Sequence, residues 1–251
     1  MEHSVVRLPM NTVTGPKVAV SRMDFDPEIC QLFERVQPFT MTSPERMYAL
    51  VQAIDYITDN HLPGAIVECG VWRGGSMMLA ALRLLERGDS SRDIFLFDTF
   101  EGMPPPTTDD VRYDGEPAAQ LLAQERRLEG SHLWAHSTLE EVHRNVLSTG
   151  YPMERVHFIR GRVEVTIPSS APECIALLRL DTDWYESTAH ELSHLFPRLG
   201  TRCPLIIDDY GYWKGARRAV DEYFSTQAIR PLLNRIDETG RCMLKMDADE
   251  T

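Results

Sequence analysis

Four aspartates stand directly after two apolar segments of the chain. In "LLRLDTDWYEST", residues 177–188, Asp181 and Asp183 follow an apolar run, and in "LIIDDY" Asp208 and Asp209 follow another. If the two runs are neighbouring parallel strands, these carboxylates meet at one edge of the sheet and repel one another in a low-dielectric site. A divalent cation relieves that repulsion, and hard oxygen ligands suit Mg²⁺. The alternative is that some of these aspartates only cap the helices that follow.

A third apolar segment ends in a carboxylate and a glycine-rich turn. The string "VECGVWRGGS" places Glu68 before Gly70 and before the pair Gly74 and Gly75. This spacing, E-x-G-x-x-x-G-G, differs from the G-x-G-x-x-G pattern that brings a pyrophosphate to a helix N-terminus. An acid before a single glycine suits a ligand with a cationic, amine-bearing tail, and S-adenosylmethionine is such a ligand. The alternative is that the glycines only form a strand-to-helix turn.

A fourth apolar segment, in "FLFDTFEG", ends in Asp98, about 30 residues after Glu68. An acid at the end of the second strand of such a sheet can accept hydrogen bonds from both hydroxyls of a ribose. The same residue can instead cap the loop that follows. Taken together with the segment around Glu68, Asp98 favours a nucleoside ligand.

Apolar segments alternate with helical patterns along most of the chain. We expect strands at residues 65–70, 93–98, 155–161, 174–181 and 204–209, and helices at 26–39, 43–60, 74–88, 138–150, 187–200 and 215–224. Because parallel neighbours need crossover connections, this alternation predicts the α/β class with a doubly wound, mostly parallel sheet. Residues 229–247 read as two strands around Glu238, Thr239 and Gly240, which predicts an antiparallel C-terminal hairpin.

The pattern also predicts how the chain divides. We expect residues 1–60 to form an N-terminal arm and a helical cap, and residues 61–251 to form one domain that contains the sheet. The stretch "TFEGMPPPTTDDVRYDGEPA", residues 99–118, is rich in proline and aspartate and cannot be regular for long. We expect residues 101–136 to form an insertion over one end of the sheet.

The composition argues against several classes of function. The chain has 251 residues, of which 43% are hydrophobic, so a sizeable core is possible. The formal net charge of −12 argues against a nucleic-acid partner. The sequence contains no apolar run close to the roughly 18 residues that cross a bilayer, so we expect no membrane partner. Five scattered cysteines without a CxxC pair argue against zinc and disulfides and predict a cytoplasmic location.

Two further features leave alternatives open. The string "HELSH", from His190 to His194, matches the H-E-x-x-H motif of zinc peptidases, although the sequence offers no obvious third ligand. Trp184, Tyr185 and Tyr210 either form an apolar wall for a sugar or pack beneath the helices.

Several ordered motifs resemble those of the macrocin-O-methyltransferase family. These are "PFTMTSPERM", "VECGVWRGGS", "DTFEGMP", "LLRLDTDWYEST" and "LIIDDYGYWKGARRAVDEYF", between about residues 38 and 224. The resemblance implies a Rossmann-like class I methyltransferase that uses S-adenosylmethionine and a divalent cation to methylate sugar hydroxyls of natural products. It also implies a small-molecule acceptor, such as a glycoside, and a homo-oligomer. The family's glycine pair before the fifth strand is missing here, where the sequence reads "GTRCPLIIDDY".

The resemblance assigns roles to individual residues. It places the metal ligands at Asp181, Asp208 and Asp209, and the general base at Asp183 or at Asp181 itself. The residues that it assigns to the cofactor are Met41, Thr42, Glu68, Gly70, Ser76 and Asp98. A catechol-type O-methyltransferase, which also chelates two neighbouring oxygens through a metal, and a non-catalytic cofactor-binding protein remain alternatives.

Overall fold

The computed structural model describes residues 25–125, 133–227 and 229–246. Most of the expected N-terminal arm, residues 1–24, lies outside the described residues, as does the middle of the insertion, residues 126–132. The division at residue 60 therefore stays a prediction.

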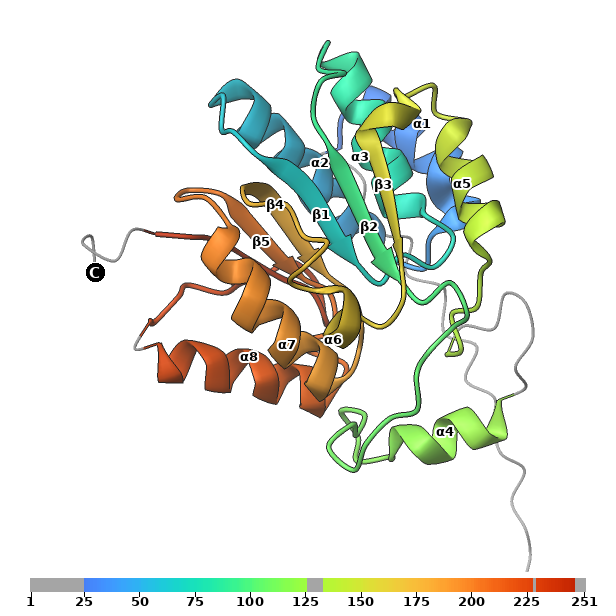
Figure 1. Cartoon of the computed structure of the whole chain (residues 1–251), viewed down its shortest axis with the longest axis vertical. Helices are drawn as coiled ribbons and strands as arrows, with labels where there is room; N and C mark the ends of the chain where they lie inside the picture. The colour runs from blue at the N-terminus through green and yellow to red at the C-terminus, as the bar shows by residue number, and fades with distance from the viewer. Residues whose placement is uncertain (1–24, 126–132, 228, 247–251) are drawn as a thin grey trace, which may run out of the picture.

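The centre of the molecule is one twisted sheet of seven strands in the order β3-β2-β1-β4-β5-β7-β6 (Figure 1). The five parallel strands are β1 (Ala65–Cys69), β2 (Ile94–Asp98), β3 (Val156–Arg160), β4 (Ile175–Leu180) and β5 (Pro204–Ile207). The chain reverses its direction of strand addition between β1 and β4, so their carboxyl ends flank a crevice where ligands bind in open α/β sheets. The predicted fold class is confirmed.

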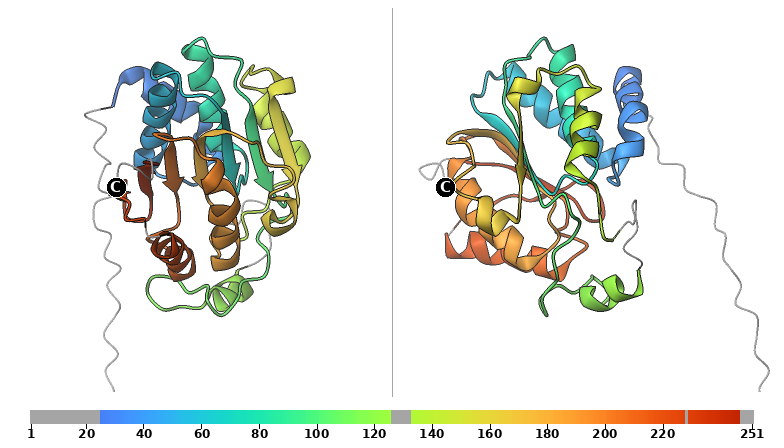
Figure 2. Two further views of the ribbon diagram at one scale, coloured as in Figure 1. Left: turned by 60° about the vertical axis from the view of Figure 1, so that its left-hand side comes forward. Right: turned by 45° about the vertical axis from the view of Figure 1, so that its right-hand side comes forward.

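Helices cover both faces of the sheet, which is why its central strands are apolar throughout. Figures 1 and 2 show one group of helices on one face, and α6 (Val163–Thr166), α7 (Tyr185–Leu195) and α8 (Lys214–Thr226) on the other. The first group consists of α1 (Pro27–Val36), α2 (Pro44–Asp59), α3 (Gly75–Glu86) and α5 (Leu139–Leu147). Every residue of β1, β4 and β5 is buried as a result. The described residues also contain three short 3₁₀ turns, at Gln37–Phe39, Met153–Arg155 and Phe196–Arg198.

The C-terminal hairpin is also confirmed. Strand β7 (Arg241–Leu244) pairs antiparallel with β5, and β6 (Asn234–Arg235) pairs antiparallel with β7. Asp237 fixes the turn between them, because its Oδ1 accepts hydrogen bonds from the amides of Thr239 (2.9 Å) and Gly240 (2.6 Å). Its Oδ2 accepts a hydrogen bond of 2.6 Å from Ser43, the residue that caps α2, so the hairpin is joined to the helical cap.

The insertion is irregular from residue 101 to residue 117, as the sequence predicts, apart from isolated bridges such as that between Arg112 and Trp213. It contains a helix, α4 (Ala118–Gln124), which lies beyond the carboxyl ends of the strands (Figure 1). Asp110 is fully buried and anchors the segment, because its carboxylate accepts hydrogen bonds from the amides of Thr107 (2.7 Å) and Tyr185 (2.8 Å). A buried side chain of the insertion thus caps α7 and holds the insertion against it.

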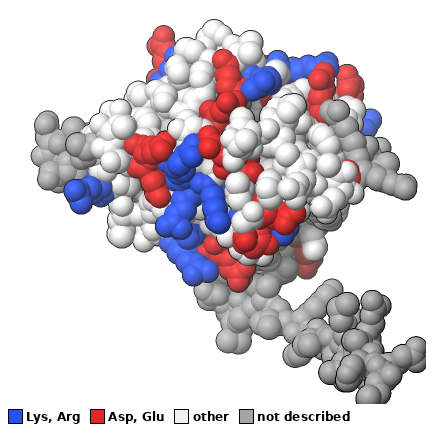
Figure 3. All heavy atoms as spheres, turned by 90° about the horizontal axis from the view of Figure 1, so that it is seen from below, with Lys and Arg blue, Asp and Glu red and all other residues white. Residues whose placement is uncertain are grey.

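Charged groups of both signs lie side by side on the face that is seen from below (Figure 3). Near the start of α8, Arg218 pairs with Asp109 of the insertion (2.7 Å) and packs over the ring of Tyr185. The expectation that no nucleic acid binds stays a prediction.

Among the described residues, no helix is long and apolar enough to cross a membrane.

Because β1 and β4 approach closely, one methyl group added at Gly70 should destabilise the fold strongly. Gly70 has a φ of +81°, and a Cβ at this position would lie 1.9 Å from the carbonyl oxygen of Asp181. We expect Gly70→Ala to lower the free energy of unfolding by about 3 kcal/mol, from the positive φ and the overlap together. Urea unfolding measures this change.

Gly88 provides the matched control. Its φ is +73°, but no atom lies within 4 Å of an added Cβ. We expect Gly88→Ala to cost only about 1 kcal/mol. If the two substitutions lower the free energy of unfolding equally, the backbone of Asp181 does not crowd Gly70.

Candidate active site

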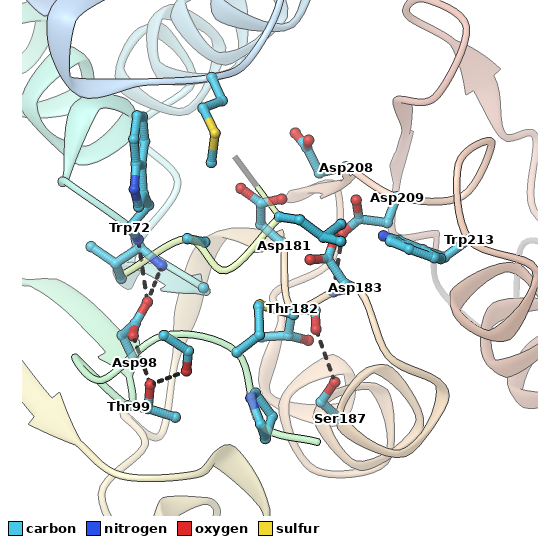
Figure 4. A pocket seen from close by; sticks show the side chains of 18 of the residues that line it. Trp72, Asp98, Thr99, Asp181, Thr182, Asp183, Ser187, Asp208, Asp209 and Trp213 are labelled. Carbon is cyan, nitrogen blue, oxygen red and sulfur yellow. Dashed lines mark hydrogen bonds between the residues drawn. The ribbon is translucent and has the colours of Figure 1, made fainter. Parts of the chain in front are cut away.

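A cavity of about 660 Å³ opens at the carboxyl ends of β1, β2, β4 and β5, under the cap and the insertion. Figure 4 shows Trp72 and Asp98 on one side of it and Asp208, Asp209 and Trp213 on the other, with Asp181 between them. The cavity therefore has two halves, one beside the glycine-rich turn and one beside the aspartates.

The first half is built from the turn after β1 and from the cap. Gly74 takes a φ of +89° at the start of α3, and a Cβ on Gly75 would lie 2.4 Å from the carbonyl oxygen of Phe39. The chain before α2 can therefore lie directly on the turn. Five of the six predicted cofactor residues line the cavity: Met41, Thr42, Gly70, Ser76 and Asp98.

Asp98 holds the turn through main-chain hydrogen bonds. Its Oδ2 accepts from the amides of Val71 (2.6 Å) and Trp72 (3.2 Å), and its Oδ1 accepts from Phe100 (2.7 Å). Burial raises the pKa of Asp98, although these hydrogen bonds oppose the shift. The loop-capping alternative thus describes what Asp98 does in the structure, and its contact with a ribose stays a prediction.

Glu68, the sixth predicted cofactor residue, does not line the cavity. It is 1% exposed, and its Oε1 accepts a hydrogen bond of 2.7 Å from Arg179 of β4. Its Oε2 is buried and has no hydrogen-bond partner among the described residues. Burial raises the pKa of Glu68 to about 7, against the lowering effect of Arg179. Its role with the cofactor stays a prediction.

Two polar atoms of cavity-lining residues are buried and have no hydrogen-bond partner within the described parts of the chain. They are the hydroxyl oxygen of Thr42 and the indole Nε1 of Trp72. Because buried polar groups are nearly always hydrogen-bonded, unpaired groups at a cavity point to a ligand that completes them. The residues present therefore fit a polar ligand such as the nucleoside and amino-acid parts of S-adenosylmethionine.

The second half of the cavity contains the aspartates. Carboxylate oxygens of Asp181, Asp208 and Asp209 lie within 4.8 Å of one another, so the structure brings together the three predicted metal ligands. Burial raises the pKa values of Asp181 and Asp209 well above their usual range. Carboxylate oxygens are the hard ligands that Mg²⁺ prefers, and a bound cation would relieve the repulsion among these three groups. The residues therefore fit Mg²⁺.

Asp183, the predicted base, lies beside this group. Its amide donates a 3.2 Å hydrogen bond to Asp209, and its φ is +67°, a region that few residues other than glycine adopt. Burial, together with the charges of Asp181 and Asp208, raises the pKa of Asp183 to about 7, although hydrogen bonds with Asp209 and Trp213 partly oppose this. Such strained residues often occur at functional sites.

Two arginines partly neutralise the charge of the carboxylates, and the sequence patterns predicted neither of them. Arg179 is 3% exposed and donates to Glu68, to Asp181 (2.6 Å) and to Asp208. Arg46 of α2 donates to the other oxygen of Asp208. A single arginine inside the apolar strand "CIALLRLD" was the available signal for Arg179, because a buried charge needs partners.

The glutamate of "HELSH" has a structural position. Glu191 is fully buried and accepts a 2.9 Å hydrogen bond from Thr182, the residue between Asp181 and Asp183. His190 and His194 contact backbone carbonyls at 3.0 and 2.9 Å, and neither joins a group of three potential metal ligands among the described residues. This geometry gives no support to a zinc peptidase.

The aromatic residues singled out in the sequence pack away from the cavity. Trp184 is buried against Trp213, while the hydroxyls of Tyr185 and Tyr210 donate to Glu222 and Asp221 of α8. The aromatic residues that line the second half of the cavity are instead Tyr212 and Trp213, just before α8.

The sequence matches the family described as Macrocin-O-methyltransferase (TylF) over residues 30–245. It is 34% identical over 201 residues to demethyldecarbamoylnovobiocin O-methyltransferase of Streptomyces niveus, which covers 80% of this chain and 73% of that relative. It is 34% identical, with the same coverage, to 8-demethyl-8-(2,3-dimethoxy-alpha-L-rhamnosyl)-tetracenomycin-C 4'-O-methyltransferase of Streptomyces olivaceus. It is 32% identical over 201 residues to mycinamicin III 3''-O-methyltransferase of Micromonospora griseorubida, with 80% of this chain and 76% of that relative covered.

Solved structures agree on the fold. The O-methyltransferase NovP superposes with a TM-score of 0.72 at 32% identity, over 83% of each chain. The calicheamicin methyltransferase CalS11 superposes with a TM-score of 0.61 at 18% identity, over 88% of this chain and 94% of that one, which shows the fold alone.

Arg179 gives a prediction about stability. Without its guanidinium, Glu68, Asp181 and Asp208 would be left close together with less positive charge between them. We expect Arg179→Met to lower the free energy of unfolding by about 3–5 kcal/mol, the usual cost of breaking a buried ion pair. Denaturant unfolding in a metal-free buffer measures the loss.

Arg160 of β3 is the control, because its ion pair with Glu101 is exposed. We expect Arg160→Met to cost less than about 1 kcal/mol. If the two substitutions cost the same, Arg179 does not neutralise the carboxylates.

Proposed function

The chain belongs to the macrocin-O-methyltransferase family and is an S-adenosylmethionine-dependent O-methyltransferase, and from this premise we propose that it methylates a sugar hydroxyl of a glycosylated natural product, using a divalent cation held by Asp181, Asp208 and Asp209. The observation that carries the proposal is the meeting of these three carboxylates in the same cavity as the glycine-rich turn. The name of one relative describes 4'-O-methylation of a compound that carries a rhamnosyl group, which supports a sugar as the acceptor.

The two halves of the cavity correspond to the two substrates. The methyl donor would lie beside Gly70 and Asp98 under the cap, where the unpaired polar atoms of Thr42 and Trp72 would bind it. The acceptor would lie under the insertion, against Tyr212 and Trp213. Asp181 stands between the two halves (Figure 4), so the acceptor hydroxyl and the methyl group would meet beside it.

In the reaction, the acceptor oxygen forms a bond to the methyl carbon while the bond between that carbon and sulfur breaks. The electron pair goes to sulfur, which leaves as part of S-adenosylhomocysteine, and the hydroxyl proton goes to a carboxylate. We assign this base to Asp183, because it lines the cavity and no ion pair with Arg179 or Arg46 occupies it. When bound, a divalent cation supplies Lewis-acid chemistry that lowers the pKa of a neighbouring hydroxyl.

The acceptor class and the cation requirement can be tested together. We expect methyl transfer from labelled S-adenosylmethionine to deoxysugar glycosides in the presence of Mg²⁺, and a loss of roughly 100-fold or more after chelation, because the carboxylates then lack a cation to hold the acceptor. Mass spectrometry of the products measures both. Preferential methylation of catechols would contradict the sugar assignment, and turnover that survives chelation would contradict the cation.

A pair of variants separates the cation from the methyl donor. We expect Asp208→Asn to lose Mg²⁺-dependent turnover by about 100-fold or more, as removal of a metal ligand should, while its affinity for S-adenosylhomocysteine stays within about threefold by calorimetry. Asp221→Asn, an exposed carboxylate of α8, should retain both properties.

The predicted contact between Asp98 and the ribose can be separated from its support of the turn. We expect Asp98→Ala to weaken the binding of S-adenosylhomocysteine by about 10-fold or more, the usual size of hydrogen bonds to a charged group. The 2′-deoxy analogue should bind the original protein less tightly than S-adenosylhomocysteine does, whereas Asp98→Ala should bind the two ligands alike.

Asp93→Ala, at the opposite end of the strand, serves as the control and should discriminate between the ligands as the original protein does. If Asp98→Ala keeps that discrimination as well, Asp98 only supports the turn.

A further inference from the structure

Arg46 occupies an unusual position for a cation. It lies in the first turn of α2, where the helix dipole disfavours positive charge, and its backbone amide is capped by the hydroxyl of Ser43 at 3.1 Å. Its side chain is largely buried, with 15% exposed, and lines the cavity. Strong interactions with carboxylates are therefore needed to hold it there.

Two carboxylates from different parts of the fold hold the guanidinium. Nε of Arg46 donates to Asp237 Oδ2 at 2.9 Å, and its Nη1 donates to Asp208 Oδ2. Asp237 belongs to the turn of the C-terminal hairpin and does not line the cavity, whereas Asp208 does. The stem of Arg46 packs on Gly240, where a Cβ would lie 2.9 Å from its Cδ.

The pair with Asp237 is favourable in its own right. Burial alone would raise the pKa of Asp237, but hydrogen bonds from Ser43 and Gly240 and the charge of Arg46 outweigh this effect, and the pKa is lowered. Arg46 therefore has a second ionised partner if it leaves Asp208.

Arg46 and Arg179 approach Asp208 differently. Arg179 binds Oδ1 and does not line the cavity, so it supports the carboxylate from the protein side. Arg46 binds Oδ2 and does line the cavity, so its positive charge stands on the side from which a cation approaches. A guanidinium and a divalent cation at the same oxygen repel each other.

From this geometry we infer that Arg46 is a resident counter-cation of the acidic cluster, which competes with the divalent cation for Asp208 Oδ2 and shifts onto Asp237 when that cation binds. The inference rests on the proposed function, in which Asp208 is a metal ligand. Arg46 is thus a positioning residue that sets the affinity of the site, and α2 stays attached to the hairpin through Asp237 in both states.

The inference predicts opposite effects for the two partners. We expect Arg46→Gln to bind Mn²⁺ about 10-fold more tightly, because a competing charge is removed. Asp237→Asn should bind Mn²⁺ several-fold more weakly, because its new amide repels Nε of Arg46 and leaves the guanidinium on Asp208. The asparagine oxygen can still accept from the amides of Thr239 and Gly240, so the turn is kept.

Electron paramagnetic resonance of free Mn²⁺ measures these affinities without turnover, on the full chain. Arg83→Gln is the matched control. Arg83 of α3 pairs at 2.7 Å with Asp55 of α2, the helix that carries Arg46, but does not line the cavity, so the affinity of this variant for Mn²⁺ should be unchanged. Circular dichroism confirms folding of each variant. If Arg46→Gln does not fold, weaker binding by Asp237→Asn supports the inference, and unchanged or tighter binding overturns it.

The outcomes separate this inference from the proposed function. If the original protein binds Mn²⁺ and Asp208→Asn does not, the cation site stands; unchanged or weaker binding by Arg46→Gln then overturns the competition alone, and weaker binding identifies Arg46 as a support of the ligand. If the original protein binds no Mn²⁺, both the site and the inference are wrong.

Discussion

The fold must hold several carboxylates close together at one edge of a buried sheet. Their mutual repulsion and their loss of hydration would prevent folding if nothing offset them. Asp181, Asp208 and Asp209 converge because they end neighbouring parallel strands, and burial makes their charge expensive. Arg179 offsets part of this charge from within the sheet, and Arg46 offsets another part from the cavity side. In the proposed function, the negative charge that remains is what binds the divalent cation.

The glycine-rich turn allows two backbone segments to lie closer together than a side chain would permit. Strand β1 ends next to β4, and Gly70 lets the backbone pass within contact of Asp181. Asp98 then fixes the turn by accepting its amides, so the end of one strand organises the end of the next. In the proposed function, the methyl donor and the acceptor meet where the two halves of the cavity join.

Segments distant in the sequence close the site over these strand ends. The chain before α2 lies on Gly75, and the hairpin turn reaches α2 through Asp237, Ser43 and Arg46. The insertion is tied to α7 through the buried Asp110. Because these contacts are close packing at Gly75 and specific hydrogen bonds at Asp237 and Asp110, the cap and the insertion have defined positions relative to the aspartates.

The sequence by itself determined the sheet class, the hairpin and the aspartates at the strand ends, because apolar periodicity and strand-end residues are local properties. It also identified the family, through motifs that carry their own order. The tertiary structure decided which side chains meet: that Glu68 turns to Arg179, that Glu191 lies beneath Thr182, and that Tyr212 and Trp213 line the cavity. It also revealed Arg46 as a partner of Asp208, 162 residues away. Such pairings depend on how distant segments pack, which no local pattern encodes.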